Sequence, residues 1–486
     1  MGKSKFQHPE WALKFKTKGT ELRYINKRYY LYKITSKWDK EKKKTRKITL
    51  EMIGKITKEE GLVPKGTKRE PKYNKIKRPI CCKEYGASNI LQRIGKNIIK
   101  HLKVSFPEQW QEIYVLAIQR LLYQAPLKNM QFHYEESYLS HTFPEINLSK
   151  NRLTSLMDNI GNDRNRIISF LKMFIEGSEH ILFDITHVIS QSTKMQVNQI
   201  GYNSQKVFDP QINLFYMFST DKQAPIYYRI VPGNISGIKA LKLTVKEAAL
   251  DKTVIIADKG FASKENIQYL QQNSLSYILP LRRNSRFMNV SRLSSRHYEK
   301  AFDGHFFFMK RAIFYTEYEK EKQRCILFFD SKLCLEEKND YLHRIEEKYE
   351  KYSIEGFKQK ELTFGTILVT TNLKNTPQKI YEKLKTRMEV ESLFDVFKNT
   401  LNADRTYMQS SQSLEAWLLI NHIALLLYYK IYTLLKNQNL LKSLSPKDLL
   451  MKLSRIVKLN INNEWVTSEI NSKTAALLSK LKLPVT

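Results

Sequence analysis

The sequence contains few cysteines, only four among 486 residues. Cys81 and Cys82 are adjacent, and Cys325 and Cys334 follow far behind, which matches neither a disulfide scaffold nor paired zinc-ligand spacing. We therefore expect a reduced, intracellular protein. Glycine and proline are sparse as well, at 16 and 14 residues, and this excludes disordered and fibrous classes.

Long apolar runs are also missing. The first residues, MGKSKFQHPEWALKFK, lack the apolar core that a signal peptide needs, so we expect none. The most apolar stretch, Trp417–Tyr429, is too short for a membrane span and is interrupted by Asn421 and His422. It predicts a buried core helix and no membrane partner. Phosphate-cradling, dinucleotide-binding and nucleophile-elbow motifs are absent too, which leaves ATP-driven and serine-hydrolase chemistry without support.

Positive charge is abundant. The chain has 82 Lys and Arg against 48 Asp and Glu, a net charge of +34. Residues 1–100 hold 29 basic and 9 acidic residues, so +20 of this charge lies in the first fifth of the chain. Since no membrane surface is expected, a polyanion such as nucleic acid is the physical candidate for a partner.

The basic front segment also contains a strand-like pattern. Residues 23–36, RYINKRYYLYKITS, mix basic, aromatic and β-branched side chains with period two, which predicts a β-hairpin. The basic run that follows includes Lys43, Lys44 and Arg46, which we predict to contact DNA phosphates. A solvated edge or a disordered tail is the alternative. The interleaved tyrosines and a tryptophan favour a folded DNA-contacting module.

The pattern of the remaining chain predicts an α/β core behind a helical region. Residues 89–175 place apolar side chains at three- and four-residue steps, which indicates helices. Strands are expected at 180–190, 213–220 and 225–233, followed by a helix at 237–250, a strand at 253–257, a helix at 264–273 and a strand at 276–283. Three consecutive strands followed by alternating helices and strands indicate a mixed sheet with helices packed on it.

Three carboxylates stand out within this pattern. Asp184 lies in the middle of the first strand, where a buried charge is costly unless it is compensated, and Asp258 ends the strand VIIAD. Glu391 belongs to an expected continuous helix over 376–401, with Arg387 one turn before it and Lys398 two turns after it on the same face. A turn or cap residue for the Asp at the strand end, and an exposed salt-bridged face for the Glu, are the alternatives.

Converging carboxylates without a Cys or His cluster suit Mg²⁺ or Mn²⁺, and two such ions per site could activate an attacking oxygen and stabilise a leaving one. Arg387 and Lys398 would then hold phosphates of bound DNA. Lys259, Arg282 and Arg283 follow strand ends on the same expected edge, where DNA contact and ordinary solvation are equally reasonable. His187 falls on the opposite strand face from Asp184, and we interpret it as structural.

With these residues the sequence resembles bacterial insertion-sequence transposases of the DDE class, which have a ribonuclease-H-like catalytic domain and a Y-R-E-K signature. The signature is Tyr, two residues, Arg, three residues, Glu, six residues, Lys. Arg387, Glu391 and Lys398 match these spacings, whereas Leu384 takes the Tyr position. Leu384 cannot make the hydrogen bond that the signature Tyr makes to a phosphate, and this role could move to Tyr381 or Lys385. FDITHV and ADKGF resemble the two Asp motifs of the group.

The resemblance implies that Asp184, Asp258 and Glu391 form a metal-binding catalytic triad. It also implies a β-rich insertion before the Glu helix, with a helix over 331–353 at its rim. The expected domains are a basic DNA-binding segment (1–80), a helical DNA-binding or dimer region (81–176), the first core part (177–284), the insertion (285–364), the second core part (365–436) and a C-terminal helical region (437–486).

The function implied is a DNA transposase that binds terminal inverted repeats and performs metal-dependent cleavage and strand transfer of the cut-and-paste type. It would act as a homodimer on double-stranded DNA, in the bacterial cytoplasm at the nucleoid. Two alternatives stay open: a nuclease on the same scaffold, and a non-catalytic DNA-binding protein derived from a transposase. A hairpin cleavage route is also open. No Trp lies between Asp258 and Glu391, so only Phe or Tyr could stack a displaced base.

Overall fold

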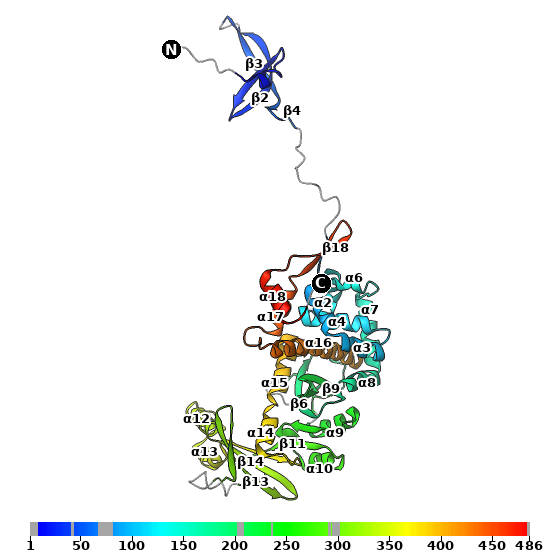
Figure 1. The fold of residues 1–486 in the computed structure, drawn as a ribbon, viewed down its shortest axis with the longest axis vertical. Coiled ribbons are helices and arrows are strands. Elements are labelled where there is room, and N and C mark those ends of the chain that lie inside the picture. The colour runs from blue at the N-terminus through cyan, green and yellow to red at the C-terminus, as the bar shows by residue number, and fades with distance from the viewer. Residues whose placement is uncertain are drawn as a thin grey trace. The chain divides into compact units, whose positions relative to one another are not determined.

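A computed structural model gives the fold of the chain (Figure 1). It describes residues 8–39, 43–66, 81–201, 209–234, 237–289, 293 and 302–483. The chain divides into two compact units, Met1–Pro79 and Ile80–Thr486. Most of the basic run over 64–79 lies outside the described residues.

The first unit is a small antiparallel sheet. Its strands pair in chain order: β1 (Thr20–Ile25), β2 (Arg28–Asp39), β3 (Lys44–Thr57) and β4 (Gly61–Pro64). The hairpin predicted over 23–36 is confirmed as β1 and β2, joined by a turn in which Asn26 and Lys27 have φ of 47° and 60°. Such left-handed residues match the twist of a two-residue hairpin. A short helix, α1 (Glu10–Leu13), adds Ala12 to the core beneath the sheet.

The second unit begins with β5 (Cys81–Glu84) and a helical region, as the sequence predicted. Its helices are α2 (Gly86–Ile94), α3 (Lys96–Ser105), α4 (Trp110–Tyr123), α5 (Met130–Glu136), α6 (Leu139–Thr142), α7 (Lys150–Asn162) and α8 (Arg164–Ile175), with a 3-10 turn, η1 (Leu127–Asn129). The side chain of Asp163 starts α8 by accepting the N–H groups of Asn165 and Arg166.

One long apolar helix, α16 (Ser411–Asn437), lies between this helical region and the sheet (Figure 1). By length and composition it could cross a membrane, but 72% of its most apolar window is buried inside the structure. It packs against α4, α7 and a sheet strand. At Gly161 of α7 the approach is so close that an added Cβ would lie 1.8 Å from the Gln412 carbonyl oxygen. The predicted core helix is therefore confirmed.

The central sheet has the ribonuclease-H-like arrangement. Its first five long strands are β6 (His180–Ser190), β8 (Pro210–Ser219), β9 (Ala224–Pro232), β10 (Val254–Ala257) and β11 (Ser276–Leu281). They lie in the order β9-β8-β6-β10-β11; β8 is antiparallel to its two neighbours, and β6, β10 and β11 run parallel. The intervening helices are α9 (Gly237–Ala248) and α10 (Lys264–Gln272). The mixed sheet predicted from the sequence is confirmed.

The β-rich insertion is also present, and it extends the core sheet rather than forming a layer of its own. β11 pairs with β15 (Thr366–Thr371), and β14 (Gln323–Asp330), β13 (Arg311–Lys320) and β12 (Gly304–Phe308) follow in that order. With the short strands β7 (Gln199–Ile200) and β16 (Arg405–Thr406), the sheet has eleven strands. The predicted rim helix is α12 (Ser331–Glu346), followed by α13 (Ile354–Lys360) and the 3-10 turn η4 (Glu361–Thr363).

The expected continuous helix over 376–401 is wrong, because the structure divides it into three segments. These are α14 (Pro377–Lys385), α15 (Met388–Asp395) and a π-helical turn, η5 (Val396–Thr400). Between the first two, the N–H groups of Thr386 and Arg387 donate to carbonyls three residues earlier rather than four. At the other end, the Leu401 N–H donates five residues back to Val396. A single regular helical face through Arg387, Glu391 and Lys398, as predicted, is therefore not maintained over this segment.

The C-terminal region is not helical throughout. It contains α17 (Pro446–Leu453), the hairpin of β17 (Val457–Ile461) and β18 (Glu464–Thr467), and α18 (Ser472–Lys480). β17 pairs with β5, so the beginning and end of this unit share one small sheet.

Candidate active site

Two of the predicted carboxylates lie side by side on the central sheet. β6 and β10 are parallel neighbours, and Ala257 pairs with Phe183 in their register. Asp258, which directly follows β10, therefore lies next to Asp184, which is inside β6. β10 ends at Ala257, whereas β6 continues to Ser190, and Asp258 leads directly into the short turn η2 (Lys259–Phe261).

The third carboxylate comes from outside the sheet. Glu391 lies in the first turn of α15, and its side chain is 64% exposed. Arg387, which precedes α15, inserts its guanidinium among the three acidic groups. One Nη donates to Asp258 at 3.1 Å, and the other lies 3.6 Å from Asp184 and 3.7 Å from Glu391. The structure thus brings Asp184, Asp258 and Glu391 together around the guanidinium of Arg387.

The electrostatics of the group centre on Asp184, whose side chain is only 19% exposed. Burial raises the pKa of Asp184 to about 6, and the negative charges of Asp258 and Glu391 act in the same direction. The backbone N–H of Ile185, which donates to Asp184 at 2.8 Å, and the charge of Arg387 act in the opposite direction. The acidic group therefore depends on a nearby positive charge to remain ionised.

The donor set fits a hard divalent cation in its chemistry, because it consists of carboxylate oxygens alone. Among the described residues, no three His, Cys, Asp or Glu side chains are grouped closely enough to hold a metal ion as they stand. The guanidinium of Arg387 lies where the three carboxylates converge. Its Nε is buried without a hydrogen-bond partner, so Arg387 is incompletely satisfied there. Withdrawal of Arg387 would leave an oxygen-lined site.

The basic residues predicted around this edge differ in their surroundings. Lys259 and Arg282 are exposed. Arg283 is already engaged: its guanidinium donates to the Thr366 carbonyl and pairs with Glu337, both at 2.9 Å, which ties β15 to α12. Its contacts are thus those of a structural residue.

Lys398 is half-buried in the π-helical turn η5, and burial lowers the pKa of its amine. In the first unit, Lys43, Lys44 and Arg46 are exposed at the far end of the β2–β3 hairpin. These three residues are free to meet a ligand.

Neither Tyr381 nor Lys385, the two candidates for the role of the missing signature Tyr, is exposed. Leu384 is buried, and Tyr381 is packed against the rings of Phe306, Phe308 and Phe328 at 5.0–5.4 Å between centroids. Tyr381 therefore joins α14 to the insertion strands. The amine of Lys385 lies 5.0 Å above the Tyr381 ring, and burial lowers its pKa. His187 is buried in β6, in agreement with a structural role.

The sequence reasoning missed a buried arginine that anchors the end of η5. Arg120 of α4 is 4% exposed and donates to Asn421 Oδ1 at 3.1 Å, to the Ala125 carbonyl at 2.9 Å and to the Leu401 carbonyl at 2.5 Å. It thereby connects the helical region, α16 and the segment after Lys398. A single Arg in the apolar run IYVLAIQRLLY was the available signal.

A second buried polar network was also missed. Arg164 pairs with Glu247 and Glu415 at 2.9 and 3.0 Å, and Arg229 pairs with Glu247 at 2.6 Å. These pairs join α8, α9, β9 and α16 beneath the sheet. Nearby, Tyr216 of β8 shares a 2.7 Å hydrogen bond with His422 Nδ1, and burial lowers the pKa of His422 to about 3.

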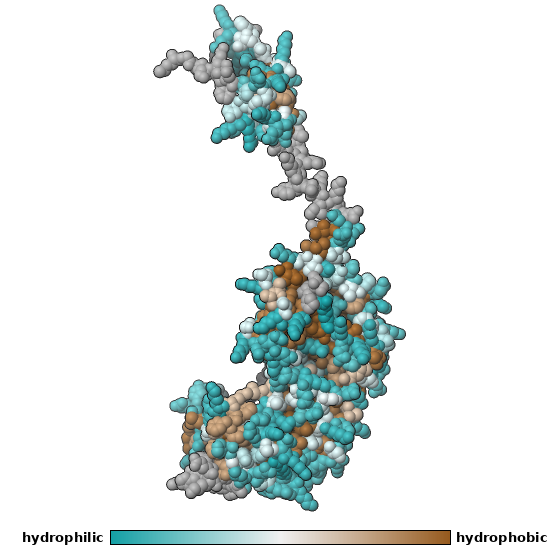
Figure 2. Space-filling view, in the orientation of Figure 1, coloured by the Kyte–Doolittle hydropathy of each residue, from teal (hydrophilic) through white to brown (hydrophobic). Residues whose placement is uncertain are grey.

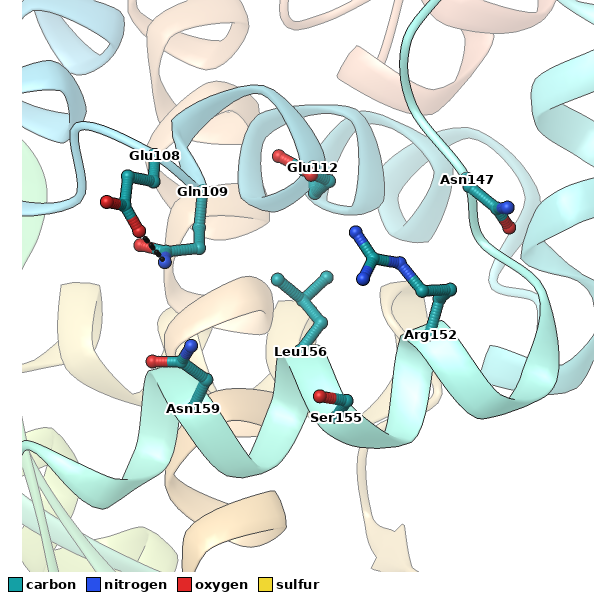
Figure 3. Close-up of a pocket in the computed structure, with 8 residues that line it drawn as sticks. All are labelled: Glu108, Gln109, Glu112, Asn147, Arg152, Ser155, Leu156 and Asn159. Atoms are coloured by element: carbon teal, nitrogen blue, oxygen red, sulfur yellow. Dashed lines mark hydrogen bonds between the residues drawn. The ribbon is translucent and has the colours of Figure 1, made fainter.

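A polar pocket of about 240 Å³ lies beside α4 and α7 and shares no residue with the carboxylate group (Figure 3). Its lining residues are Glu108, Gln109, Glu112, Asn147, Arg152, Ser155, Leu156 and Asn159. Gln109 is held there by Arg166 at 3.1 Å, so this pocket is part of the helical packing.

The sheet order and the carboxylate edge define a ribonuclease-H-like α/β domain of the kind that carries an acidic site. The family model for the transposase DDE domain matches residues 176–427, just over half of the chain, and the protein belongs to this family. No curated protein sequence matches the chain.

Solved structures similar to the chain include two transposase complexes. A piggyBac transposase synaptic complex with hairpin DNA is 12% identical, with a TM-score of 0.39, over 76% of this chain and 79% of that one. A Mos1 transposase paired-end complex with the left transposon end is 13% identical, with a TM-score of 0.15, over 43% and 60% of the two chains.

Proposed function

We propose that this DNA transposase performs divalent-metal-dependent DNA cleavage and strand transfer at the carboxylate group described above. The observation that supports this is the convergence of Asp184, Asp258 and Glu391, from β6, the end of β10 and α15, on one guanidinium. A purely structural ion pair would not need three acidic groups at the open end of the parallel strands.

The carboxylates would hold Mg²⁺ or Mn²⁺, and bound cations would supply activation of the attacking oxygen and stabilisation of the leaving oxygen. Asp184 is oriented by the Ile185 N–H, so one oxygen is already positioned by the backbone. When cations take over the compensation of charge, Arg387 is released from the carboxylates and can pair with a DNA phosphate.

The substrate we propose is double-stranded DNA, first the terminal inverted repeats of an insertion sequence and then a target. Cleavage would release a 3′-hydroxyl, which then replaces a bridging oxygen of a target phosphodiester while the displaced oxygen keeps the bond electrons. One phosphodiester is exchanged for another, so no high-energy cofactor is required. A homodimer on DNA, in the bacterial cytoplasm, would handle the two ends together.

The test incubates the full-length protein with Mg²⁺, a labelled duplex of the inverted repeat that borders the reading frame, and a target plasmid. Joined product supports transposition, and cleavage without joining supports the nuclease alternative. Specific binding without chemistry, in Mg²⁺ or Mn²⁺, would refute the enzymatic proposal.

A matched pair of variants tests the site itself. Asp184→Ala should abolish cutting and leave DNA binding intact. Asp251→Ala, at an exposed turn before β10, removes the same charge and should leave both unchanged. Full activity of Asp184→Ala would show that the chemistry lies elsewhere.

A further inference from the structure

The hairpin of β2 and β3 extends well beyond the small sheet to which it belongs. β1 pairs with β2 only as far as Lys33, and β4 pairs with β3 only over Gly54–Thr57. Among the described residues, the outer part of the hairpin, 34–39 with 44–49, therefore has no third strand beside it. We call these two segments the outer ribbon.

The outer ribbon leaves the sheet through two irregularities. The register of β2 and β3 shifts between Leu31 and Tyr32 and again between Lys33 and Ile34, so that Ile53 and Leu50 are not paired with a residue of β2. Such bulges bend a strand and increase its right-handed twist. A twisted two-stranded ribbon follows the path of a helical groove better than a flat one.

One face of the outer ribbon is mainly basic: it carries Lys37, Arg46 and Lys44, with Asp39 opposite Lys44 as its acidic residue. Lys37 lies directly opposite Arg46, and opposed like charges destabilise an antiparallel pair. Residues 33–50 contain eight Lys and Arg but only two Asp and Glu. The repulsion between Lys37 and Arg46 would be relieved by a bound polyanion.

The other face combines charge with an exposed ring. Trp38 is 59% exposed opposite Thr45, and Lys47 lies two positions along opposite Ser36. The bulged Leu50 is 55% exposed. Around such scattered apolar side chains the surface of this unit is largely hydrophilic (Figure 2). A protein partner would bury a continuous apolar patch, whereas isolated apolar contacts among many cations suit nucleic acid.

We propose that the outer ribbon enters the major groove of double-stranded DNA, with the face of Lys37 and Arg46 toward the base edges. The major groove admits a two-stranded ribbon, and Lys and Arg recognise the O6 and N7 acceptors of guanine there. The proposal rests on the proposed function, in that the chain acts on DNA, and it assigns sequence selection of that DNA to this ribbon.

The test measures binding of the full-length protein to two duplexes by fluorescence anisotropy: the inverted repeat bordering the reading frame, and the same bases in scrambled order. In Lys37→Ala/Arg46→Ala, binding to the repeat should weaken at least about ten-fold, and its preference over the scrambled duplex should be lost. The control, Lys58→Ala/Lys65→Ala, removes two exposed charges near β4 and should weaken both duplexes equally and less. Circular dichroism checks that both variants fold.

Methylation of guanine N7, which lies in the major groove, gives an independent readout. Methylated guanines in the repeat should inhibit binding of the unmodified protein and not of Lys37→Ala/Arg46→Ala. Three results would overturn the proposal. They are an equal loss of affinity for both duplexes in both double variants, binding that is insensitive to N7 methylation, and a preference for single-stranded DNA or RNA. Strand joining that continues alongside any of these results would leave the proposed function standing, whereas absence of all DNA binding would remove both.

Discussion

Replacement of Arg387 by glutamine tests whether a single guanidinium is the internal counter-ion of the three carboxylates. Its terminal nitrogens lie 3.1, 3.6 and 3.7 Å from Asp258, Asp184 and Glu391. The glutamine amide would keep hydrogen-bonding capacity but remove the charge, so the acidic side chains would repel one another in the absence of metal. We expect the metal-free protein to lose stability.

The size of the loss follows from exposure. Breaking a buried ion pair costs about 3–5 kcal/mol, and losing an exposed one costs about 0–1 kcal/mol. Arg387 and Asp184 are four-fifths buried, whereas Asp258 is 37% and Glu391 64% exposed and contribute less. We therefore expect about 2 kcal/mol, of which the Asp184 pair supplies most.

The assay is urea denaturation in EDTA and in millimolar Mg²⁺. The destabilisation of Arg387→Gln should shrink in Mg²⁺, because the cation replaces the missing charge. Calorimetric titration should show tighter Mn²⁺ binding in the variant, roughly ten-fold, since no guanidinium has to be displaced. The control is Arg405→Gln, which removes an arginine that lies 3.9 Å from the Asp404 carboxylate. It should change neither the stability in EDTA nor the Mn²⁺ affinity. Equal stability of Arg387→Gln and the unmodified protein in EDTA, or equal Mn²⁺ affinity, would refute the counter-ion role.

Substitutions at three other residues test the packing around the site. Arg120→Met should lower the free energy of unfolding by about 3 kcal/mol, because three buried acceptors, including the Leu401 carbonyl, lose their donor. Urea denaturation measures this change, and a loss under about 1 kcal/mol would contradict the prediction. The pKa of His422 in the folded protein, about 3, lies below its usual value of 6.5, so its contribution to the free energy of unfolding is fully present above pH 6.5. This contribution should fall by about 1.4 kcal/mol for each pH unit from pH 6.5 toward pH 3. His422→Gln should flatten this slope, and an unchanged slope would exclude His422 as its source. Tyr381→Phe should leave DNA affinity unchanged, because the Tyr381 ring is packed against the insertion strands. Tyr381→Ala should lower the free energy of unfolding by about 3–5 kcal/mol. Weaker DNA binding by Tyr381→Phe would show that the hydroxyl reaches DNA.

Local pattern was sufficient for most of the core. The strand HILFDITHVIS carries β-branched and aromatic residues around one carboxylate, and it forms β6 over the same residues. VIIAD is followed by the short turn η2, which agrees with the prediction that Asp258 lies at a strand end. These elements are predictable because strand formation and burial depend on short-range alternation and hydrophobicity. The same reasoning failed over 376–401, because no proline or glycine marks the interruption at Thr386 and Arg387.

Composition and short-range pattern are enough to predict the parts: a basic front segment, an α/β order of elements, and three carboxylates with an Arg one turn before the last. Long-range packing brings these parts together. Parallel pairing of β6 with β10 puts Asp258 beside Asp184, and the tightened turn before α15 lets Arg387 reach both. Likewise, Tyr381 is buried because the insertion strands join the core sheet and cover it. Such contacts join residues that are far apart in the chain, and their energies depend on distance and burial, which exist only once the sheet has formed.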